Sequence, residues 1–194
     1  PKNKILFRKS TREQLGIPEN SILIFFVGSG FERKGLKFLL QSTEFLEDQN
    51  WRLLLMGKGN FDKYLHFAPY NKRDQIIAEK PNPEIEKFYA AADLFILPSI
   101  YEPFGNVNLE ALATGLPVIT TKYCGAANII DEKINGLIIE DPFNPQEIAK
   151  NINFLFNSSL REIMGKKARD LAEQFPPERN KREMLQIYES VVRS

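Results

Sequence analysis

The chain has 194 residues, of which 43% are hydrophobic and 11% aromatic, enough for one domain to bury a core without a metal or a disulfide. Its 26 Lys and Arg balance 25 Asp and Glu, so the overall charge does not favour nucleic acid or an acidic membrane surface as a partner. One cysteine, Cys124, excludes an internal disulfide, and one histidine, His66, leaves no Cys/His cluster for structural zinc.

Short hydrophobic runs alternate with helical patterns along the chain. Residues 1–20 form a lead-in with a short basic helix that ends at Gly16. Strands are then expected at 21–28, 51–57, 75–79, 93–99, 116–121 and 136–140. Helices are expected between them at 34–46, 61–67, 84–91, 106–114 and 126–131, and after them at 145–156, 160–175 and 177–192.

The predicted strands are nearly continuous hydrophobic runs, which is typical of strands buried on both faces of a parallel sheet. We therefore expect an α/β fold, a Rossmann-like parallel sheet with helices on both faces. No apolar run approaches the roughly 20 residues of a transmembrane helix, so no transmembrane segment is expected. Because the chain begins with Pro1, we expect it to be part of something longer.

Five loops follow predicted strands and should gather at the carboxyl edge of the sheet, where open parallel sheets bind ligands. They read GSGFERK, GKGN, KPNP, SIYEPFGN and KYCGA. The first precedes a helix whose free N–H groups favour an anion, and it carries Arg33 and Lys34. Its third glycine comes two positions too late for a dinucleotide fingerprint. A glycine turn with solvated basic residues is an equally good interpretation of this loop alone.

Two glutamates flank the Phe-Gly-Asn turn in YEPFGNVNLEALATGLPVITT. Glu102 lies in the loop, and Glu110 lies about one turn inside the helix that the turn begins. A carboxylate suits a vicinal diol and a helix start suits phosphate, which together suggest a nucleotide sugar. Alternatively, both glutamates merely complement the helix dipole. The apolar sequence around Glu110 predicts that this carboxylate is buried and needs a polar partner.

The same segment resembles the signature of family-four (group 1) retaining glycosyltransferases of the two-domain GT-B architecture. In that signature, two glutamates separated by seven residues precede an Ala-x-x-x-Gly-x-Pro-Val segment. FFVGSGFERKGLKFLLQS is similar to the family's first strand and phosphate loop, FYAAADLFILPS to the strand before the signature, and CGAANIIDEKINGLIIEDP to the segment after it. The resemblance covers roughly residues 21–194, and in detail it is strongest to the lipopolysaccharide core glucosyltransferases.

The resemblance implies that residues 1–194 are the carboxyl-terminal, donor-binding half of a GT-B fold. Residues 1–20 would come from the interdomain linker, and the helix at 177–194 would cross toward the absent amino-terminal domain. Glu110 would hold the ribose hydroxyls and Glu102 the hydroxyls of the transferred sugar. Lys34, with Arg33 beside it, would pair with the diphosphate. The remaining donor contacts would come from Gly30, Lys80, Asn82, Phe104, Gly105, Asn106 and Val107.

The reaction implied is transfer of a hexose from a UDP- or GDP-linked sugar to a glycan or glycolipid acceptor, with retention of configuration. Metal independence is expected because the chain has no Asp-x-Asp motif. No cofactor is expected beyond the donor substrate. The acceptor site and any peripheral membrane association would belong to the missing half, in the cytoplasm or at the inner face of the membrane. The isolated half would be inactive.

Two positions depart from the family pattern. Ser29 stands where the family usually has an arginine, so Arg33 would have to supply that charge. Asn128 stands where many members carry a glutamate, which leaves the donor open.

Two other functions remain open. A hydride-transferring or other nucleotide-binding Rossmann protein is opposed by the misplaced third glycine. A non-catalytic sugar-nucleotide-binding subunit is opposed by the presence of Glu102, Glu110 and Lys34. We interpret His66 as a packing or surface residue and Cys124 as a small buried apolar one.

Overall fold

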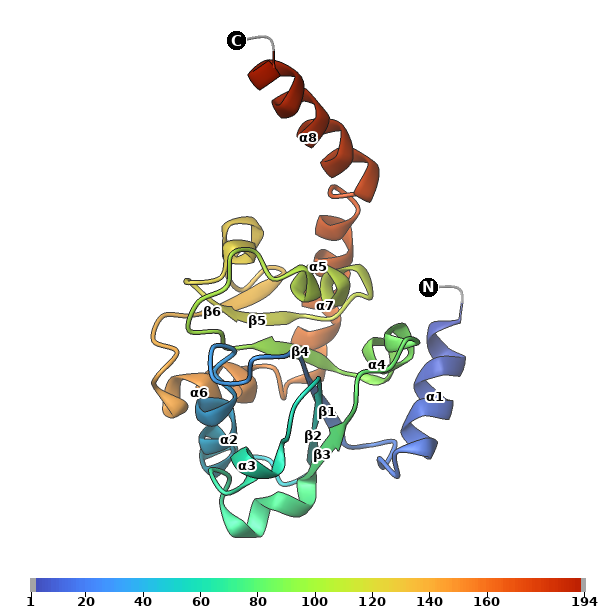
Figure 1. The fold of residues 1–194 in the computed structure, drawn as a ribbon. Coiled ribbons are helices and arrows are strands. Elements are labelled where there is room, and N and C mark those ends of the chain that lie inside the picture. Colours follow the sequence, from blue (N-terminus) through green and yellow to red (C-terminus); the bar gives the residue numbers. More distant parts are fainter. Residues whose placement is uncertain (1–2, 193–194) are drawn as a thin grey trace.

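A computed structural model describes residues 3–192, and it contains a single six-stranded parallel sheet (Figure 1). The order across the sheet is β3-β2-β1-β4-β5-β6. Each strand lies within a segment that the hydrophobic runs predicted, so the fold class is confirmed. The strands are β1 (Ile22–Val27), β2 (Trp51–Met56), β3 (Ile76–Glu79), β4 (Leu94–Leu97), β5 (Val118–Thr121) and β6 (Gly136–Ile139).

Helices cover both faces of the sheet. On one face α2 packs against α6, and on the other α1 packs against α4 and α5 against α7 (Figure 1). The α-helices are α1 (Lys4–Gln14), α2 (Leu36–Ser42), α3 (Asp62–Leu65), α4 (Ile85–Ala91), α5 (Asn106–Ala113), α6 (Pro145–Phe154), α7 (Ser158–Ala172) and α8 (Pro177–Val192). Three 3-10 helices complete the set: η1 (Thr43–Phe45), η2 (Tyr70–Gln75) and η3 (Gly125–Ile129).

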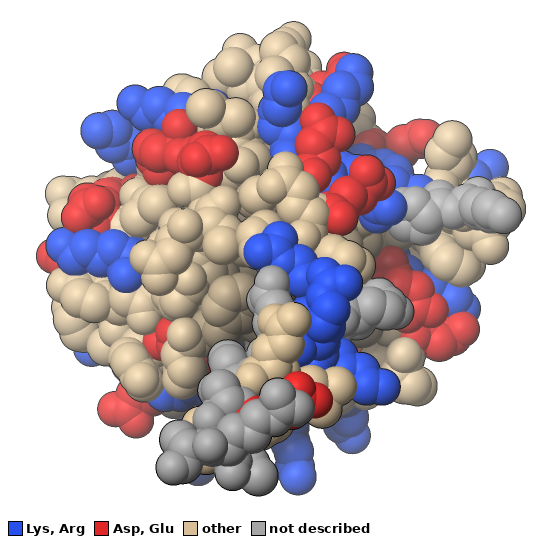
Figure 2. All heavy atoms as spheres, turned by 90° about the horizontal axis from the view of Figure 1, so that it is seen from above, with Lys and Arg blue, Asp and Glu red and all other residues tan. Residues whose placement is uncertain are grey.

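The core lies between the helices and the sheet. Every residue of β1, β4 and β5 is buried, which is the burial expected of central strands in a parallel sheet. The last helix, α8, extends away from the sheet (Figure 1), and its Met184, Leu185 and Tyr188 side chains are exposed. Acidic and basic side chains are interspersed in small groups over the face seen in Figure 2.

Three expectations were wrong in detail. The run at 75–79 predicted a strand buried on both faces, but β3 is an edge strand and only partly buried, because a short apolar run does not show where in the sheet a strand lies. Residues 125–129 form a 3-10 helix instead of an α-helix. Helix α2 begins at Leu36 because Gly35 before it has a left-handed φ of 70°.

Helix α1 is fixed to the domain by the carboxylate of Asp93, which lies just before β4. Its Oδ1 accepts a hydrogen bond from Arg8 at 2.7 Å, and its Oδ2 accepts from Arg12 at 3.2 Å and from the Leu23 amide at 2.7 Å. The Arg12 side chain is only 3% exposed and also donates to the carbonyl of Ala91. The lead-in helix is therefore joined to the sheet by a largely buried ion network.

We expect Asp93→Ala to lower the free energy of unfolding by about 2 kcal/mol, because Arg12 would remain buried without its carboxylate while keeping its carbonyl partners. Urea unfolding followed by circular dichroism would measure the loss. The matched control is Asp170→Ala, which removes an exposed aspartate from α7. Equal stability of the two variants would contradict the role given to Asp93.

Candidate functional site

The strand order reverses between β1 and β4, and the loops that follow these two strands meet at the carboxyl edge there. From β1 the chain proceeds to β2 and β3 on one side, then crosses back to β4 and continues to β5 and β6 on the other. The amide of Ile100, after β4, donates to the carbonyl of Arg33, after β1, at 2.9 Å. A Cβ on Gly35 would lie 2.0 Å from the carbonyl oxygen of Pro98, so only glycine fits this approach. Open parallel sheets bind ligands at such a reversal point.

The loops after β2 and β5 join the same edge. The Ser29 hydroxyl accepts a hydrogen bond from the Lys58 amide at 3.2 Å, so this side chain binds the neighbouring loop. Glu102 forms a parallel bridge with Cys124, in which its amide donates to the Tyr123 carbonyl at 3.1 Å. The predicted gathering of these four loops is therefore present in the structure.

Glu102, Lys34 and Arg33 form one charge cluster. The Lys34 ammonium lies 2.5 Å from Oε2 of Glu102, and Nη1 of Arg33 lies 2.9 Å from the same oxygen. The Glu102 and Lys34 side chains are 11% and 9% exposed, whereas that of Arg33 is 47% exposed. Partial burial alone would raise the pKa of Glu102, but hydrogen bonds and charge from Lys34 and Arg33 outweigh it and hold that pKa below its usual value.

Both cations use Oε2 of Glu102, and no donor in the described part of the chain binds Oε1. Glu102 is thus ionised at neutral pH, with one acceptor oxygen available to a hydroxyl group. This arrangement combines a diol acceptor with two cations, the combination that the sequence predicted for this edge.

The start of α5 lies in close contact with Glu102 of this cluster. Gly105 precedes the helix with a φ of 78°, and a Cβ there would lie 3.0 Å from Cγ of Glu102 and 2.8 Å from Nδ2 of Asn108. The first amides of the helix, at Asn106 and Val107, have no intrahelical acceptor and lie at the positive end of the helix dipole. The helix start and the two cations together make this surface suitable for an anion.

Two buried side chains, Cys124 and Asn108, stabilise the turn at Phe104 and Gly105. The Cys124 thiol donates to the Phe104 carbonyl at 3.0 Å, and Nδ2 of Asn108 donates to Sγ of Cys124 at 3.3 Å. Both side chains are buried, as predicted for Cys124, but the thiol has a hydrogen-bonding role that the prediction of a purely apolar one omitted. The turn at Gly105 is therefore held by polar contacts as well as by packing.

Glu110 has the expected polar partner but not the expected burial. It is exposed on the outer face of α5, whose buried residues are Asn108, Ala111 and Leu112. The apolar composition of the helix misled the prediction, because composition does not show on which face a residue lies. Oε2 of Glu110 accepts a hydrogen bond from the Tyr89 hydroxyl at 2.9 Å.

The structure does not bring every predicted residue into contact with this cluster. Oδ1 of Asn82 accepts from the Glu84 amide at 2.9 Å and so shapes the turn before α4. Across residues 3–192, no hydrogen bond or ion pair links Lys80 or Asn82 to Glu102 or Glu110. Gly30, with a φ of 74°, accepts a hydrogen bond from the Lys34 amide and belongs to the turn itself.

His66 is exposed, as expected of a surface histidine. Its ring centroid lies 4.0 Å from that of Phe67. No hydrogen bond or ion pair of the described residues connects its ring to Glu102, Lys34 or Arg33.

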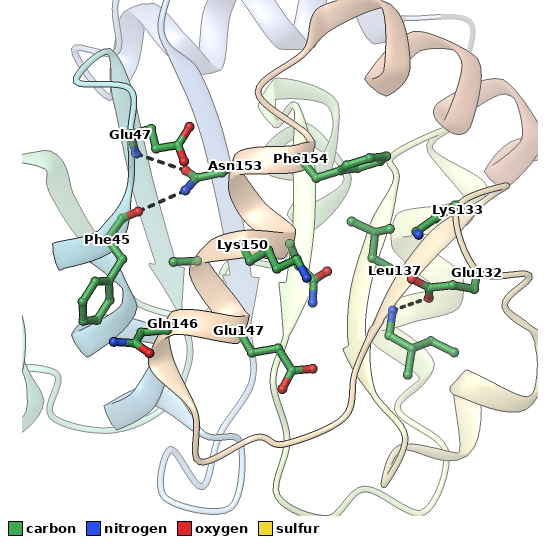
Figure 3. Close-up of a pocket in the computed structure, with 13 residues that line it drawn as sticks. Phe45, Glu47, Glu132, Lys133, Leu137, Gln146, Glu147, Lys150, Asn153 and Phe154 are labelled. Carbon is green, nitrogen blue, oxygen red and sulfur yellow. Dashed lines mark hydrogen bonds between the residues drawn. The ribbon is translucent and has the colours of Figure 1, made fainter.

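A hollow of about 720 Å³ lies elsewhere, along α6 and the start of β6 (Figure 3). Two of the carboxylates that line it already accept hydrogen bonds from the main chain. Glu132 accepts from the Ile138 amide at 2.7 Å, and Glu147 accepts from the Glu140 amide at 2.6 Å. The residues that line the hollow include none of the predicted site residues.

The described residues contain neither a metal-binding group of side chains nor a helix that could span a membrane. Within 3–192, no group of three or more His, Cys, Asp or Glu is arranged to hold a metal ion. None of the helices in that range is long and apolar enough to span a bilayer.

Sequence reasoning missed two aromatic residues that shape the site. Phe31, in the loop after β1, stacks on Phe61 at a centroid distance of 4.3 Å and meets Tyr64 edge-on, which anchors the loop. The signal was a large apolar residue within an otherwise polar loop. The second is Tyr89, whose signal was a tyrosine in an apolar helix, because a buried tyrosine hydroxyl usually has a hydrogen-bond partner.

Comparison with known proteins identifies the family. Residues 7–171 match the family described as "Glycosyl transferases group 1". An uncharacterised glycosyltransferase of Methanocaldococcus jannaschii, MJ1607, is 31% identical over 95% of this chain and 48% of its own length. The lipopolysaccharide glucosyltransferase WaaG of Escherichia coli is 31% identical over 86% of this chain and 46% of its own.

The solved structures agree in fold. The crystal structure of WaaG matches with a TM-score of 0.79 at 31% identity, covering 86% of this chain and 46% of that one. The crystal structure of Anabaena HepE in complex with UDP and glucose matches with a TM-score of 0.85 at 23% identity, covering 95% of this chain and 52% of that one. The chain thus spans about half the length of these relatives. The parallel sheet is the GT-B type of Rossmann-like domain, and the chain belongs to the group 1 glycosyltransferases.

Proposed function

We propose that this chain is the nucleotide-sugar-binding half of a retaining glycosyltransferase that transfers a hexose from a UDP- or GDP-linked donor to a glycan or glycolipid acceptor. The observation that carries the proposal is the convergence of Lys34 and Arg33 on Glu102 beside the start of α5. It places cations, a helix N-terminus and a diol acceptor together at one edge. The name of WaaG and the UDP and glucose bound to HepE support the same donor class.

In this proposal the diphosphate lies against the start of α5 and the Lys34 ammonium. As the bond to the sugar breaks, the leaving diphosphate gains negative charge. Lys34, Arg33 and the amides of Asn106 and Val107 would stabilise that charge with little reorganisation, because the ion pairs with Glu102 and the backbone of α5 already hold them. These cations would neutralise the diphosphate in place of a metal ion, which is why we propose metal-independent transfer.

The two glutamates take separate roles in the proposal. Oε1 of Glu102, which has no donor in the described part of the chain, would accept a hydroxyl of the transferred sugar. Glu110 would accept the ribose hydroxyls. Phe104 and Gly105 would present main-chain groups to the sugar and diphosphate, and the loop with Lys80 and Asn82 would flank the base. The acceptor would bind in the other half of the enzyme, in the cytoplasm or at the inner face of the membrane, where peripheral association would use that other half.

A thermal-shift panel tests the proposal directly. UDP, GDP, their sugar conjugates and the corresponding nucleosides would each be added to the 194-residue chain. A ligand that binds only the folded state raises the melting temperature by mass action, so at least one nucleoside diphosphate should raise it well above its nucleoside. No shift with any diphosphate at millimolar concentration would contradict the proposal.

We expect Lys34→Ala to weaken UDP binding roughly tenfold, because a charge-assisted contact to phosphate is lost, and to leave uridine binding almost unchanged. The difference should shrink as salt is added, because ions screen the interaction. Titration calorimetry with both ligands would measure it, with Lys63→Ala on α3 as the control. Equal losses for UDP and uridine would show that Lys34 does not contact the diphosphate.

A further inference from the structure

The Tyr89 side chain extends from α4 and packs against aromatic rings of two central strands. The residue is 2% exposed, and its ring meets that of Phe25 edge-on at 5.1 Å and that of Phe95 at 5.8 Å. Phe25 belongs to β1 and Phe95 to β4, the two strands between which the strand order reverses. Because three rings pack together, the position of the Tyr89 hydroxyl is set by the core.

That hydroxyl reaches from the core to the outer face of α5. It lies 2.9 Å from Oε2 of Glu110 and 3.3 Å from the carbonyl oxygen of Val107. Burial, followed by the charge and hydrogen bond of Glu110, raises the pKa of Tyr89. The phenol therefore keeps its proton at neutral pH and acts as a donor to the carboxylate.

We propose that Tyr89 is a positioning residue that fixes the Glu110 carboxylate for a ribose diol. This inference rests on the proposed function and adds to it a residue outside the loops of the edge. An exposed glutamate on a helix samples several rotamers, so a ligand that orders it loses binding free energy to the lost side-chain entropy. With Oε2 held by a phenol anchored in the core, Oε1 and the remaining lone pair of Oε2 face the ligand in one arrangement.

A purely structural role for Tyr89 would not explain why its hydroxyl donates its shorter hydrogen bond to Glu110. The Val107 carbonyl, 3.3 Å away, already lies within reach of the buried hydroxyl. The shorter bond goes instead to Glu110, an exposed side chain that contributes nothing to the core. A core tyrosine is thus linked directly to a surface carboxylate of the candidate site.

The test compares UDP with 2′,3′-dideoxy-UDP, which lacks both ribose hydroxyls, by titration calorimetry on the 194-residue chain. Tyr89→Phe keeps the ring and removes only the hydroxyl. We expect it to weaken UDP about three- to tenfold and to leave the dideoxy ligand unaffected, because only the diol uses the oriented carboxylate. In a Glu110→Ala background, Tyr89→Phe should have no further effect on UDP. Tyr70→Phe removes an exposed hydroxyl as the matched control.

Each contrary result has a distinct meaning. If Tyr89→Phe weakened both ligands equally, or kept its full effect in the Glu110→Ala background, Tyr89 would be structural and the inference would be wrong. If the wild-type chain bound UDP no better than dideoxy-UDP, the ribose would not lie at Glu110. That result would overturn this part of the proposed function, and the inference with it.

Discussion

The 194-residue chain should bind UDP or GDP and yet transfer no sugar to any acceptor. Lys34, Arg33 and Glu102 lie together at the carboxyl edge of the sheet, and the proposed function places the acceptor in the other half of the enzyme. Sugar transfer requires an acceptor beside the donor and exclusion of water, which closure of a second domain supplies. The relatives that the chain matches are about twice its length, which leaves room for such a domain.

The measurement is a transfer assay with a radiolabelled nucleotide sugar and a panel of glycan acceptors. Transfer by the chain alone should not exceed that of a Glu102→Ala variant. A longer chain that includes the proposed amino-terminal half should be active and should lose activity with the same substitution. Calorimetry on the chain alone should show weak diphosphate binding. Transfer by residues 1–194 above the Glu102→Ala background would disprove the two-domain interpretation.

Much of the fold could be predicted because the strands of a parallel sheet are buried along their length. All six hydrophobic runs are strands, since such runs favour burial on both faces. The position of a strand in the sheet could not be predicted. Ile76 and Ile77 form a short apolar run, yet β3 lies at the sheet edge and both residues are only partly buried. The delayed start of α2 depends on Gly35 meeting Pro98, a contact across two loops.

The candidate site was predictable where its residues follow strands and unpredictable where they come from elsewhere. Arg33, Lys34 and Glu102 follow β1 and β4, so the carboxyl-edge rule brings them together. Tyr89 lies on α4 and donates to Glu110 on α5, a contact between two helices that no local sequence pattern predicts. Helix packing decides which side of α5 faces water. Polarity does not show that side in the sequence, because the buried Asn108 and the exposed Glu110 are both polar.

Glu110→Gln should weaken UDP binding roughly tenfold to hundredfold, or about 1.5–3 kcal/mol, because a neutral amide replaces a carboxylate that accepts the ribose hydroxyls. The fold should persist, because Glu110 is exposed and glutamine can still accept the Tyr89 hydrogen bond. The control is Glu162→Gln, an exposed glutamate on α7 whose partner is Lys166. Dideoxy-UDP should bind both variants and the wild type alike.

The comparison with Lys34→Ala makes the assignment specific. If Glu110 serves the ribose and Lys34 the diphosphate, Glu110→Gln should weaken uridine and UDP by the same factor, whereas Lys34→Ala should affect UDP alone. Added salt should reduce the Lys34 effect more, because that contact joins two charges and the Glu110 contact joins a charge to neutral hydroxyls. Unchanged UDP affinity in Glu110→Gln would remove this residue from the site and leave its carboxylate as a partner for the helix dipole and for Tyr89 only.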